Sequence, residues 1–450
     1  MKSIIIQTLL MQSQNISRLT KLFALGGLML LSLNAISQEV PSPKQSKPIA
    51  IIGATVHPVS GDDIPNATLL FENGKIKAIG TSVSIPQDAE RIDAKGKHVY
   101  PALINAFSSV GLQEIGAVDM TVDLNETGLL NPNIRAEVAV NAESQLIPTT
   151  RANGVLISCI YPRGGLITGT AAAIELDGWT WEEMTLRAPL ALAINFPRIT
   201  PSSGGFFRQS REEQIKTRDR NLKELAKAFA DARAYLKAKD AESTSGTFHE
   251  TDVRWEAMRG AIERKIPVHF FADEESQIEA AVAFAEREKL RAVIIGGYDA
   301  WKLAPLLNAK KIPVVVTKIH RLPSNRSDAY DALYSLPKKL YDLGVNFCIA
   351  DNGSGEQERN LPYNAGTAAA YGLPKAEALK AITLSSAKVL GIDDRVGSLE
   401  VGKDATLFLS SGDPLEILSQ VEMAFIQGKR VELTSKHTRL YEKYKKRYGQ

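Results

Sequence analysis

Eight short apolar segments follow one another between residues 99 and 351, and charged helical or long connecting stretches separate several of them. Two clear helical patterns, at residues 211–240 and 275–289, come after the fourth and fifth segments. Apolar strands that alternate with helices predict parallel βαβ units, and eight such units predict an α/β fold, the TIM (β/α)8 barrel. The segments are VYPALINAF, GVLISCIYP, AAAIELDG, LALAINFP, IPVHFFAD, RAVIIGGY, IPVVVTKI and VNFCIAD, of which the third would suit a helix equally well.

Shorter segments that alternate apolar and polar residues lie at both ends of this series. IAIIGATVHPV, ATLLFENGKIKAIG and ERIDAKGKHVY precede it, and GSLEVGKDATLFLSSGD and VEMAFIQGKRVEL follow it. The pair Asn73-Gly74 stands between two such runs, which is a strong hairpin signal. We therefore expect one small β domain built from residues 47–100 and 396–434, beside a barrel at residues 101–395.

The last residues, 435–450, form a basic tail in which HTRLYEKYKKRYGQ interleaves aromatic and basic residues at roughly helical spacing. This pattern favours a solvated helix that packs on the surface through its tyrosines. Contact with a membrane surface or a partner is the alternative.

The N-terminus carries an apolar run, LFALGGLMLLSLNAIS, which follows Arg18 and Lys21 and ends in small residues. A basic region, an apolar stretch and small residues in this order predict a signal peptide over residues 1–37 that is cleaved after Ser37. Its basic region is long, so translation from Met11 is the alternative to a start at Met1. We therefore expect an exported protein, periplasmic or secreted. The run is shorter than the ~20 residues that span a bilayer, so we expect no membrane span after its removal, although a retained anchor is the alternative.

Charge and cysteine content exclude other classes. A formal net charge of +3 over 450 residues is too small to indicate a nucleic-acid-binding protein. The two cysteines, Cys159 and Cys348, lie in apolar segments that we place two strands apart around the barrel. At ~4.8 Å per strand their separation exceeds the ~7 Å limit for bridged Cα atoms, which predicts two buried thiols and no disulfide.

Several segments carry a resemblance to a known family. ENGKIKAIG and DAKGKHVYPALINA near the start, and AITLSSAKVLGI and VGSLEVGKDATLFL near the end, resemble the amidohydrolase superfamily, in particular its imidazolonepropionase-like branch. The resemblance implies a β-sandwich from both chain ends beside a distorted TIM barrel. It also implies hydrolysis of carbon–nitrogen bonds, in cyclic amides or similar small molecules, with zinc or another divalent metal. The family's metal ligands are a His-x-His pair after strand one, a carboxylated lysine after strand four, histidines after strands five and six, and an aspartate after strand eight.

This sequence departs from that ligand pattern at four of the five places. The His-x-His pair aligns with Phe107 and Ser109, and Asn195 lies near the place of the lysine. Phe271 takes the place of the histidine after strand five, and the glycines of IIGGYD take the place of the next. Asp351 alone matches, whereas known catalytic zinc sites use three protein ligands. We therefore expect no metal ligands and no cofactor, with Asp351 left as the candidate catalytic base.

Three further residues are candidates for substrate contact. Arg163, in YPRGGLITGT, could bind a carboxylate through a forked pair of hydrogen bonds, or could lie exposed in a tight turn. His320 follows the seventh strand and could reach the barrel mouth or lie in an ordinary loop. His269 lies two residues before Phe271 and shares its inward face one layer deeper, where a hydrogen-bonded core histidine is the favoured interpretation. The glycine-rich loop DNGSGEQERNLPYN, after the eighth strand, is expected to be solvated or to act as a lid.

Two functions follow from these residues. The favoured hypothesis is a non-catalytic or weakly active binding or assembly partner that holds a small-molecule ligand, forms a homo-oligomer or pairs with an active amidohydrolase. The alternative is an active amidohydrolase with an unconventional metal site, in which Asp351 is the base.

Overall fold

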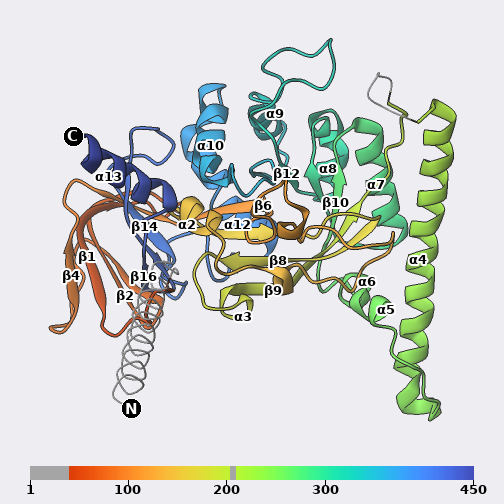
Figure 1. Cartoon of the computed structure of the whole chain (residues 1–450), viewed down its shortest axis with the longest axis horizontal. Coiled ribbons are helices and arrows are strands. Elements are labelled where there is room, and N and C mark those ends of the chain that lie inside the picture. Colours follow the sequence, from red (N-terminus) through yellow and green to blue (C-terminus); the bar gives the residue numbers. More distant parts are fainter. Residues whose placement is uncertain (1–39, 203–208, 450) are drawn as a thin grey trace, which may run out of the picture. The chain divides into compact units, whose positions relative to one another are not determined.

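The computed structural model describes residues 40–202 and 209–449, so the predicted signal peptide at residues 1–37 lies outside the described residues. An eight-stranded sheet in the middle of the chain positions the site (Figure 1). Its strands lie side by side in chain order, and all eight apolar segments contribute one. They are β6 (Leu103–Ser108), β7 (Val155–Ile160), β8 (Ile167–Glu175), β9 (Thr185–Asn195), β10 (Val268–Ala272), β11 (Ala292–Gly296), β12 (Val314–Val316) and β13 (Phe347–Ile349).

This sheet curls into a nearly closed, distorted barrel. β6 and β13 are the two ends of the strand order. They are joined by the Asp351 backbone N–H, which donates to Asn105 Oδ1 at 3.0 Å. The expected distorted barrel is therefore confirmed, and its first and last strands meet beside Asp351.

The prediction that all eight strands are parallel is wrong for β8, which runs antiparallel to both β7 and β9. Only residues 161–166 connect β7 to β8. A parallel connection needs a dozen or more residues, so this short link can only form an antiparallel hairpin. The other neighbouring pairs are parallel, as expected.

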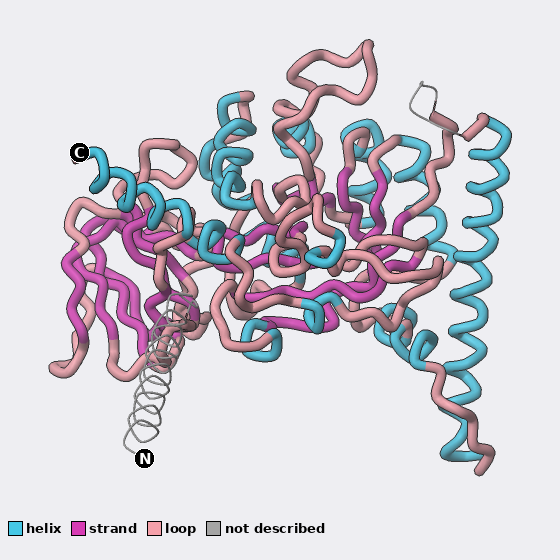
Figure 2. The backbone as a smooth tube through the Cα atoms, viewed as in Figure 1, coloured by secondary structure: helices cyan, strands magenta, loops and turns pink. Residues whose placement is uncertain are grey.

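Helices follow most of the later strands and cover the outside of the barrel (Figure 2). The longest, α4 (Arg211–Ser245), begins at a capping box in which the Ser210 and Glu213 side chains each accept from the other residue's backbone N–H. Its buried Phe229 ring lies 5.4 Å from the Phe284 ring. The other helices are α2 (Leu146–Arg151), α3 (Trp181–Met184), α5 (Val253–Ala257), α6 (Arg259–Ile262), α7 (Glu275–Arg287), α8 (Ala304–Lys310), α9 (Leu336–Asp342), α10 (Leu361–Ala370), α11 (Lys375–Ala381) and α12 (Leu384–Leu390).

A second eight-stranded sheet combines the two ends of the chain. Its strand order is β16-β15-β14-β5-β1-β2-β3, with β4 paired to β1. The Asn73-Gly74 turn joins β2 to β3 with φ values of 52° and 74°, which confirms the predicted hairpin. The strands are β1 (Ile49–Val56), β2 (Ile64–Glu72), β3 (Lys75–Gly80), β4 (Glu90–Asp93), β5 (His98–Pro101), β14 (Leu407–Ser410), β15 (Val421–Ile426) and β16 (Lys429–Val431).

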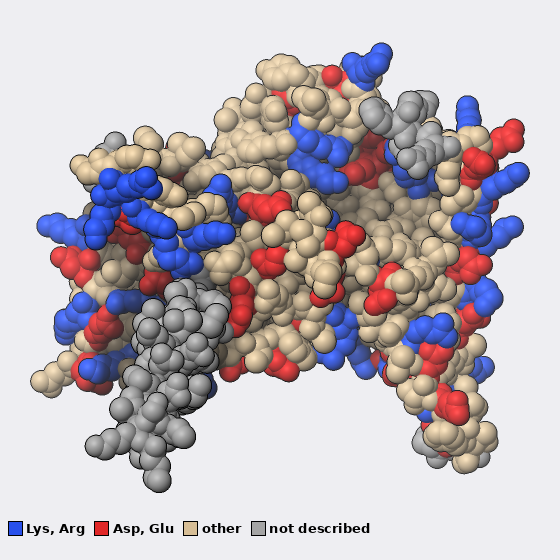
Figure 3. Space-filling model, viewed as in Figure 1, with Lys and Arg blue, Asp and Glu red and all other residues tan. Residues whose placement is uncertain are grey.

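The C-terminal helix α13 (Lys436–Tyr448) forms as expected but does not pack through its tyrosines. It has no buried residue, and Tyr441, Tyr444 and Tyr448 are all exposed. Lysine and arginine side chains gather over it (Figure 3). The periodicity correctly predicted a helix, but a stripe of tyrosines does not by itself provide a surface to pack against.

Cys159 on β7 and Cys348 on β13 are both free and buried, which confirms the predicted pair of thiols. Burial raises the pKa of each thiol to about 12. In the part of the chain that the structure describes, no helix combines the length and the apolar composition needed to cross a bilayer.

Candidate functional site

A cavity of about 1030 Å³ lies at the carboxyl ends of β9, β10, β11 and β12. The viewed face is hollowed there, beside a cluster of basic and acidic side chains (Figure 3). The carboxyl ends of barrel strands are where the active sites of TIM barrels lie, so this cavity is the candidate site. Its lining includes Phe107, Asn195, Phe271, Tyr298, Lys318 and Arg321.

The floor of the cavity is aromatic. The Phe107 and Phe271 rings lie 5.5 Å apart, and each lies within 5.6 Å of the Tyr161 ring. Both phenylalanines stand where the resemblance places metal-binding histidines, and a phenyl ring has no lone pair to coordinate a cation. The strand ends therefore present an apolar surface at these two places.

The loop after β13 seals the part of the barrel mouth above β6 and β7. The Ser109 hydroxyl donates to the Gly353 carbonyl at 2.9 Å, and the Arg163 guanidinium donates to the same oxygen. Arg163 also lies over the Phe107 ring, with its Cζ atom 5.3 Å from the ring centroid. The predicted candidate Arg163 thus holds the loop, and it is not among the residues that line the cavity.

Gly353 is required at the centre of this contact. Its φ of 79° is a left-handed conformation. A Cβ atom at this position would overlap the Phe107 ring and would lie 2.6 Å from the Arg163 guanidinium. The loop was expected to be solvated or to act as a lid, but residues 353 and 355 are buried and 352 and 356 exposed, so the loop folds partly into the mouth.

Asp351 is buried at the end of β13. Burial raises the pKa of its carboxyl group to about 6, and its Oδ2 has no hydrogen-bond partner among the described residues. It is also outside the lining of the cavity. The carboxylate has free acceptor capacity, but a molecule in the cavity does not touch it in this arrangement.

The two histidine candidates lie apart from the cavity. His269 is fully buried, and its Nδ1 lies 2.8 Å from the Tyr161 hydroxyl, while its Nε2 has no partner among the described residues. Burial lowers the pKa of His269 to about 3, so the ring is neutral. His320 is exposed, and its Nε2 lies 2.7 Å from Thr367 Oγ1. The structure does not bring either histidine into the lining of the cavity.

Glu358 is a residue that the sequence analysis missed. It is fully buried below the mouth, where the hydroxyls of Ser108 on β6 and Ser158 on β7 donate to its two carboxyl oxygens. Burial raises the pKa of this carboxyl group to about 7. The available signal was a serine in each of two mostly apolar strands, because a buried hydroxyl needs a partner.

The residues at the family's ligand positions do not fit a divalent metal ion. A phenyl ring stands at two of these positions, and the Ser109 hydroxyl is engaged by Gly353. Over residues 40–202 and 209–449, no group of three or more His, Cys, Asp or Glu has an arrangement that could hold a metal ion. Asp351 and His269 each have a buried side-chain atom without a hydrogen-bond partner among the described residues, whereas a catalytic zinc site uses three protein ligands.

Comparisons with known proteins agree with this fold. The family model described as "Amidohydrolase family" matches residues 181–431. An imidazolonepropionase from Symbiobacterium thermophilum is 25% identical over 388 residues, which cover 77% of this chain and 84% of that protein. The amidohydrolase tasK from Hapsidospora irregularis is 23% identical over 397 residues, 80% of this chain, but the chain spans 39% of that relative's length.

Among solved structures, an amidohydrolase from Thermotoga maritima MSB8 is similar, with a TM-score of 0.75 and 28% sequence identity. The match covers 85% of this chain and 99% of that one. The likeness therefore extends over both the barrel and the second sheet.

Proposed function

Since this chain belongs to the amidohydrolase family, we propose that it keeps the barrel of a carbon–nitrogen hydrolase as a binding protein, with little or no hydrolysis. The observation that carries the proposal is the contact of Ser109, Arg163 and Phe107 with Gly353. These groups fill the part of the mouth where the family holds its metal. The open cavity lies beside them, over β9 to β12, and can still hold a small molecule.

The chemical reason concerns the attacking water. Free water has a pKa of ~15.7, and a metal ion lowers it to ~7, which supplies hydroxide at neutral pH. With a donor set that does not fit such an ion, hydrolysis of an amide loses its main source of nucleophile. Binding energy from the cavity remains, because it depends on shape and charge at the strand ends.

Metal analysis and an amidase assay test this proposal on the chain from residue 38 onward. We expect substoichiometric zinc, iron and manganese after gel filtration. We also expect no chelator-sensitive hydrolysis of any member of a panel of cyclic amides and dipeptides. A stoichiometric metal that is lost together with hydrolysis on chelation would refute it.

One observation favours the alternative of an active amidohydrolase. Asp351 has an unpartnered carboxylate oxygen next to the mouth, as a general base would need. If this alternative holds, Asp351→Asn should abolish any measured turnover, whereas Asn352→Asp, which moves the carboxylate to an exposed neighbour, should not rescue it in the double variant. Turnover that survives Asp351→Asn would leave the alternative without its base.

Export and assembly complete the proposal. The apolar run before residue 38 supports a periplasmic or secreted protein. The described residues lack three ligands that fit a metal ion, and a second chain could supply the missing ones, so we also propose assembly with itself or with an active amidohydrolase. Sedimentation of the purified chain, alone and with cell-envelope extract, and N-terminal sequencing of the exported form test these two points.

A further inference from the structure

We infer that the cavity at the ends of β9 to β12 binds a small organic oxyanion, a carboxylate or a phosphate, that carries a flat apolar group. This inference rests on one part of the proposed function, namely that the cavity is the binding site, and it adds the chemical class of the ligand. It comes from the charges and rings that line the cavity.

The acidic side of the cavity is partly neutralised by two of the protein's own cations, Arg198 and Lys302. Glu274 forms an ion pair with Arg198. Lys302 Nζ lies 2.9 Å from Asp299 and 3.5 Å from Glu275. Each of these three carboxylates has a cationic partner, but Lys302 is shared by two of them, so their charge is only partly neutralised.

Asp273 and the exposed Glu279 also line the cavity, and neither forms an ion pair among the described residues. Both belong to the side formed by β10 and α7. The negative charge that remains therefore lies on the β10 side of the cavity.

The basic side of the cavity is formed by the segment after β12, whose two cations have no ion-pair partner among the described residues. Lys318 and Arg321 both line the cavity, are half-buried and form no ion pair within the described residues. Two cations without an ion-paired carboxylate among the described residues suit an oxyanion, and the nearby Asp328 is engaged by the Tyr298 hydroxyl.

Arg321 has hydrogen-bonding capacity to spare. Its guanidinium lies over the Tyr298 ring at 5.4 Å, and one terminal nitrogen donates to Ser324 Oγ at 2.5 Å. Its Nε is buried and has no hydrogen-bond partner among the described residues. An unsatisfied buried donor is unfavourable, and a guanidinium edge suits the two oxygens of a carboxylate or phosphate.

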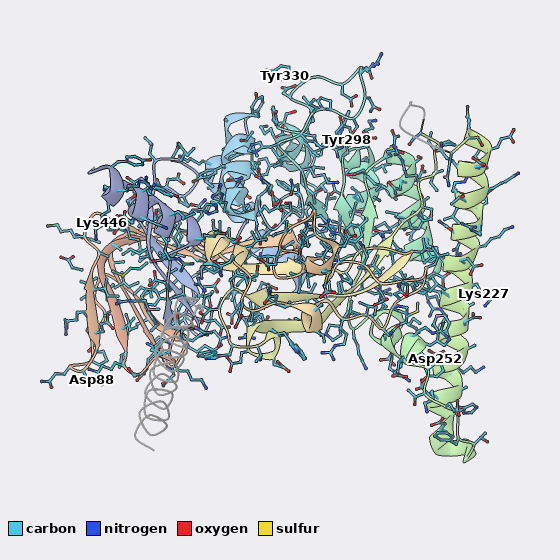
Figure 4. All side chains as sticks on the ribbon, in the orientation of Figure 1. Asp88, Lys227, Asp252, Tyr298, Tyr330 and Lys446 are labelled. Carbon is cyan, nitrogen blue, oxygen red and sulfur yellow. The ribbon has the colours of Figure 1, made fainter. Side chains whose placement is uncertain are left out.

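The rings supply the second half of the site. Phe107, Phe271 and Tyr298 line the same cavity, and Tyr298 lies at the strand ends below the loop that carries Tyr330 (Figure 4). Aromatic faces favour a flat apolar group through offset or edge contacts. The volume of about 1030 Å³ matches the upper end of the size range of small-molecule sites, roughly 300–1,000 Å³.

Calorimetry with three matched probes tests the inference on the chain from residue 38 onward. The probes are 3-phenylpropionate, phenyl phosphate and the neutral 3-phenylpropanamide. We expect at least one anion to bind about tenfold or more tightly than the amide, as a charge-assisted hydrogen bond provides. The stronger of the two anions identifies the oxyanion as a carboxylate or a phosphate.

Charge removal inside and outside the cavity provides the control. The double variant Lys318→Gln/Arg321→Gln should bind the anion no more tightly than the amide. Lys311→Gln/Arg326→Gln removes the same charge from two exposed residues outside the lining and should keep the preference.

Three results would overturn the inference: no binding of any probe, equal binding of anion and amide, or equal losses in the two double variants. A different measurement tests the proposed function. A stoichiometric metal with chelator-sensitive hydrolysis would refute the binding-protein proposal but would leave the anion preference unchanged.

Discussion

Single residues in the barrel carry ionisable groups whose environment the sequence does not reveal. Glu358 lies 250 residues from Ser108 and 200 from Ser158 along the chain, yet both hydroxyls donate to its carboxyl group. Glu356 and Arg359, in the same glycine-rich loop, are exposed. Only the folded topology determines which acidic residue of this loop turns inward.

Glu358 should make stability depend on pH. Its pKa is raised from 4.5 to about 7, so between these values the folded chain holds a proton that the unfolded chain has lost. Stability therefore falls as pH rises through this window and levels off above it. Glu358→Gln removes this contribution, and the stability of the variant relative to the parent should rise by roughly 3 kcal/mol between pH 4.5 and 7.5.

Urea unfolding of both proteins at several pH values measures that difference. Glu356→Gln, in the exposed neighbour, is the control and should leave the difference flat. The buried Glu175, whose pKa burial also raises to about 7, contributes equally to all three proteins and cancels. A flat difference for Glu358→Gln would show that the carboxyl group is not held protonated.

At the scale of elements, the apolar segments predicted the strands well, because a buried strand must be apolar along its length. They did not predict the direction of β8, which depends on the short connection at residues 161–166. The alternating segments at the chain ends predicted the second sheet because successive side chains of a half-buried strand point to opposite faces. The loop after β13 was the least predictable element, because its inward path depends on Phe107, Ser109 and Arg163. These residues lie at or just after the ends of β6 and β7, far away in the sequence.

Gly353→Ala tests the contact that holds this loop. The new Cβ atom would overlap Phe107 and crowd Arg163, and the backbone would remain left-handed. We expect a loss of about 2–4 kcal/mol in the free energy of unfolding, from backbone strain and overpacking together.

Gly96→Ala is the matched control for this change. Gly96 has φ of 74°, close to the 79° of Gly353, but a Cβ atom there would meet nothing within 4 Å. It should cost only the backbone term, about 1 kcal/mol. Equal losses in the two variants, measured by urea unfolding, would mean that the loop is not packed against the mouth.

At the scale of the whole molecule, the two ends of the chain depend on each other. β5, from the N-terminal part, pairs with β14, from the C-terminal part, and β14 in turn pairs with β15. Asp404 lies between the two parts: its carboxylate is 2.5 Å from Lys75 and 2.7 Å from Arg395. Because the side chain of Asp404 is 2% exposed, these ion pairs are largely shielded from water on the acidic side.

Removing this carboxylate should weaken the whole second sheet. Asp404→Ala leaves two partly exposed cations without their shared hydrogen-bonding partner, and we expect a loss of about 2 kcal/mol in the free energy of unfolding. Glu90→Ala breaks the Arg430–Glu90 pair, which also joins the two ends of the chain but is half exposed on both sides. That control should cost less than about 1 kcal/mol. Similar denaturation midpoints for both variants would contradict a structural role for Asp404.

The contact of Arg163 with Gly353 also limits attempts at redesign. Introducing Phe107→His and Ser109→His would recreate the missing imidazole pair beneath a guanidinium that repels any incoming dication. Gly353, whose carbonyl accepts a hydrogen bond from Arg163, would lose its aromatic neighbour Phe107 in the same step. Building the family's metal site on this scaffold would therefore require a rebuilt loop and a neutral residue at position 163, in addition to the new ligands.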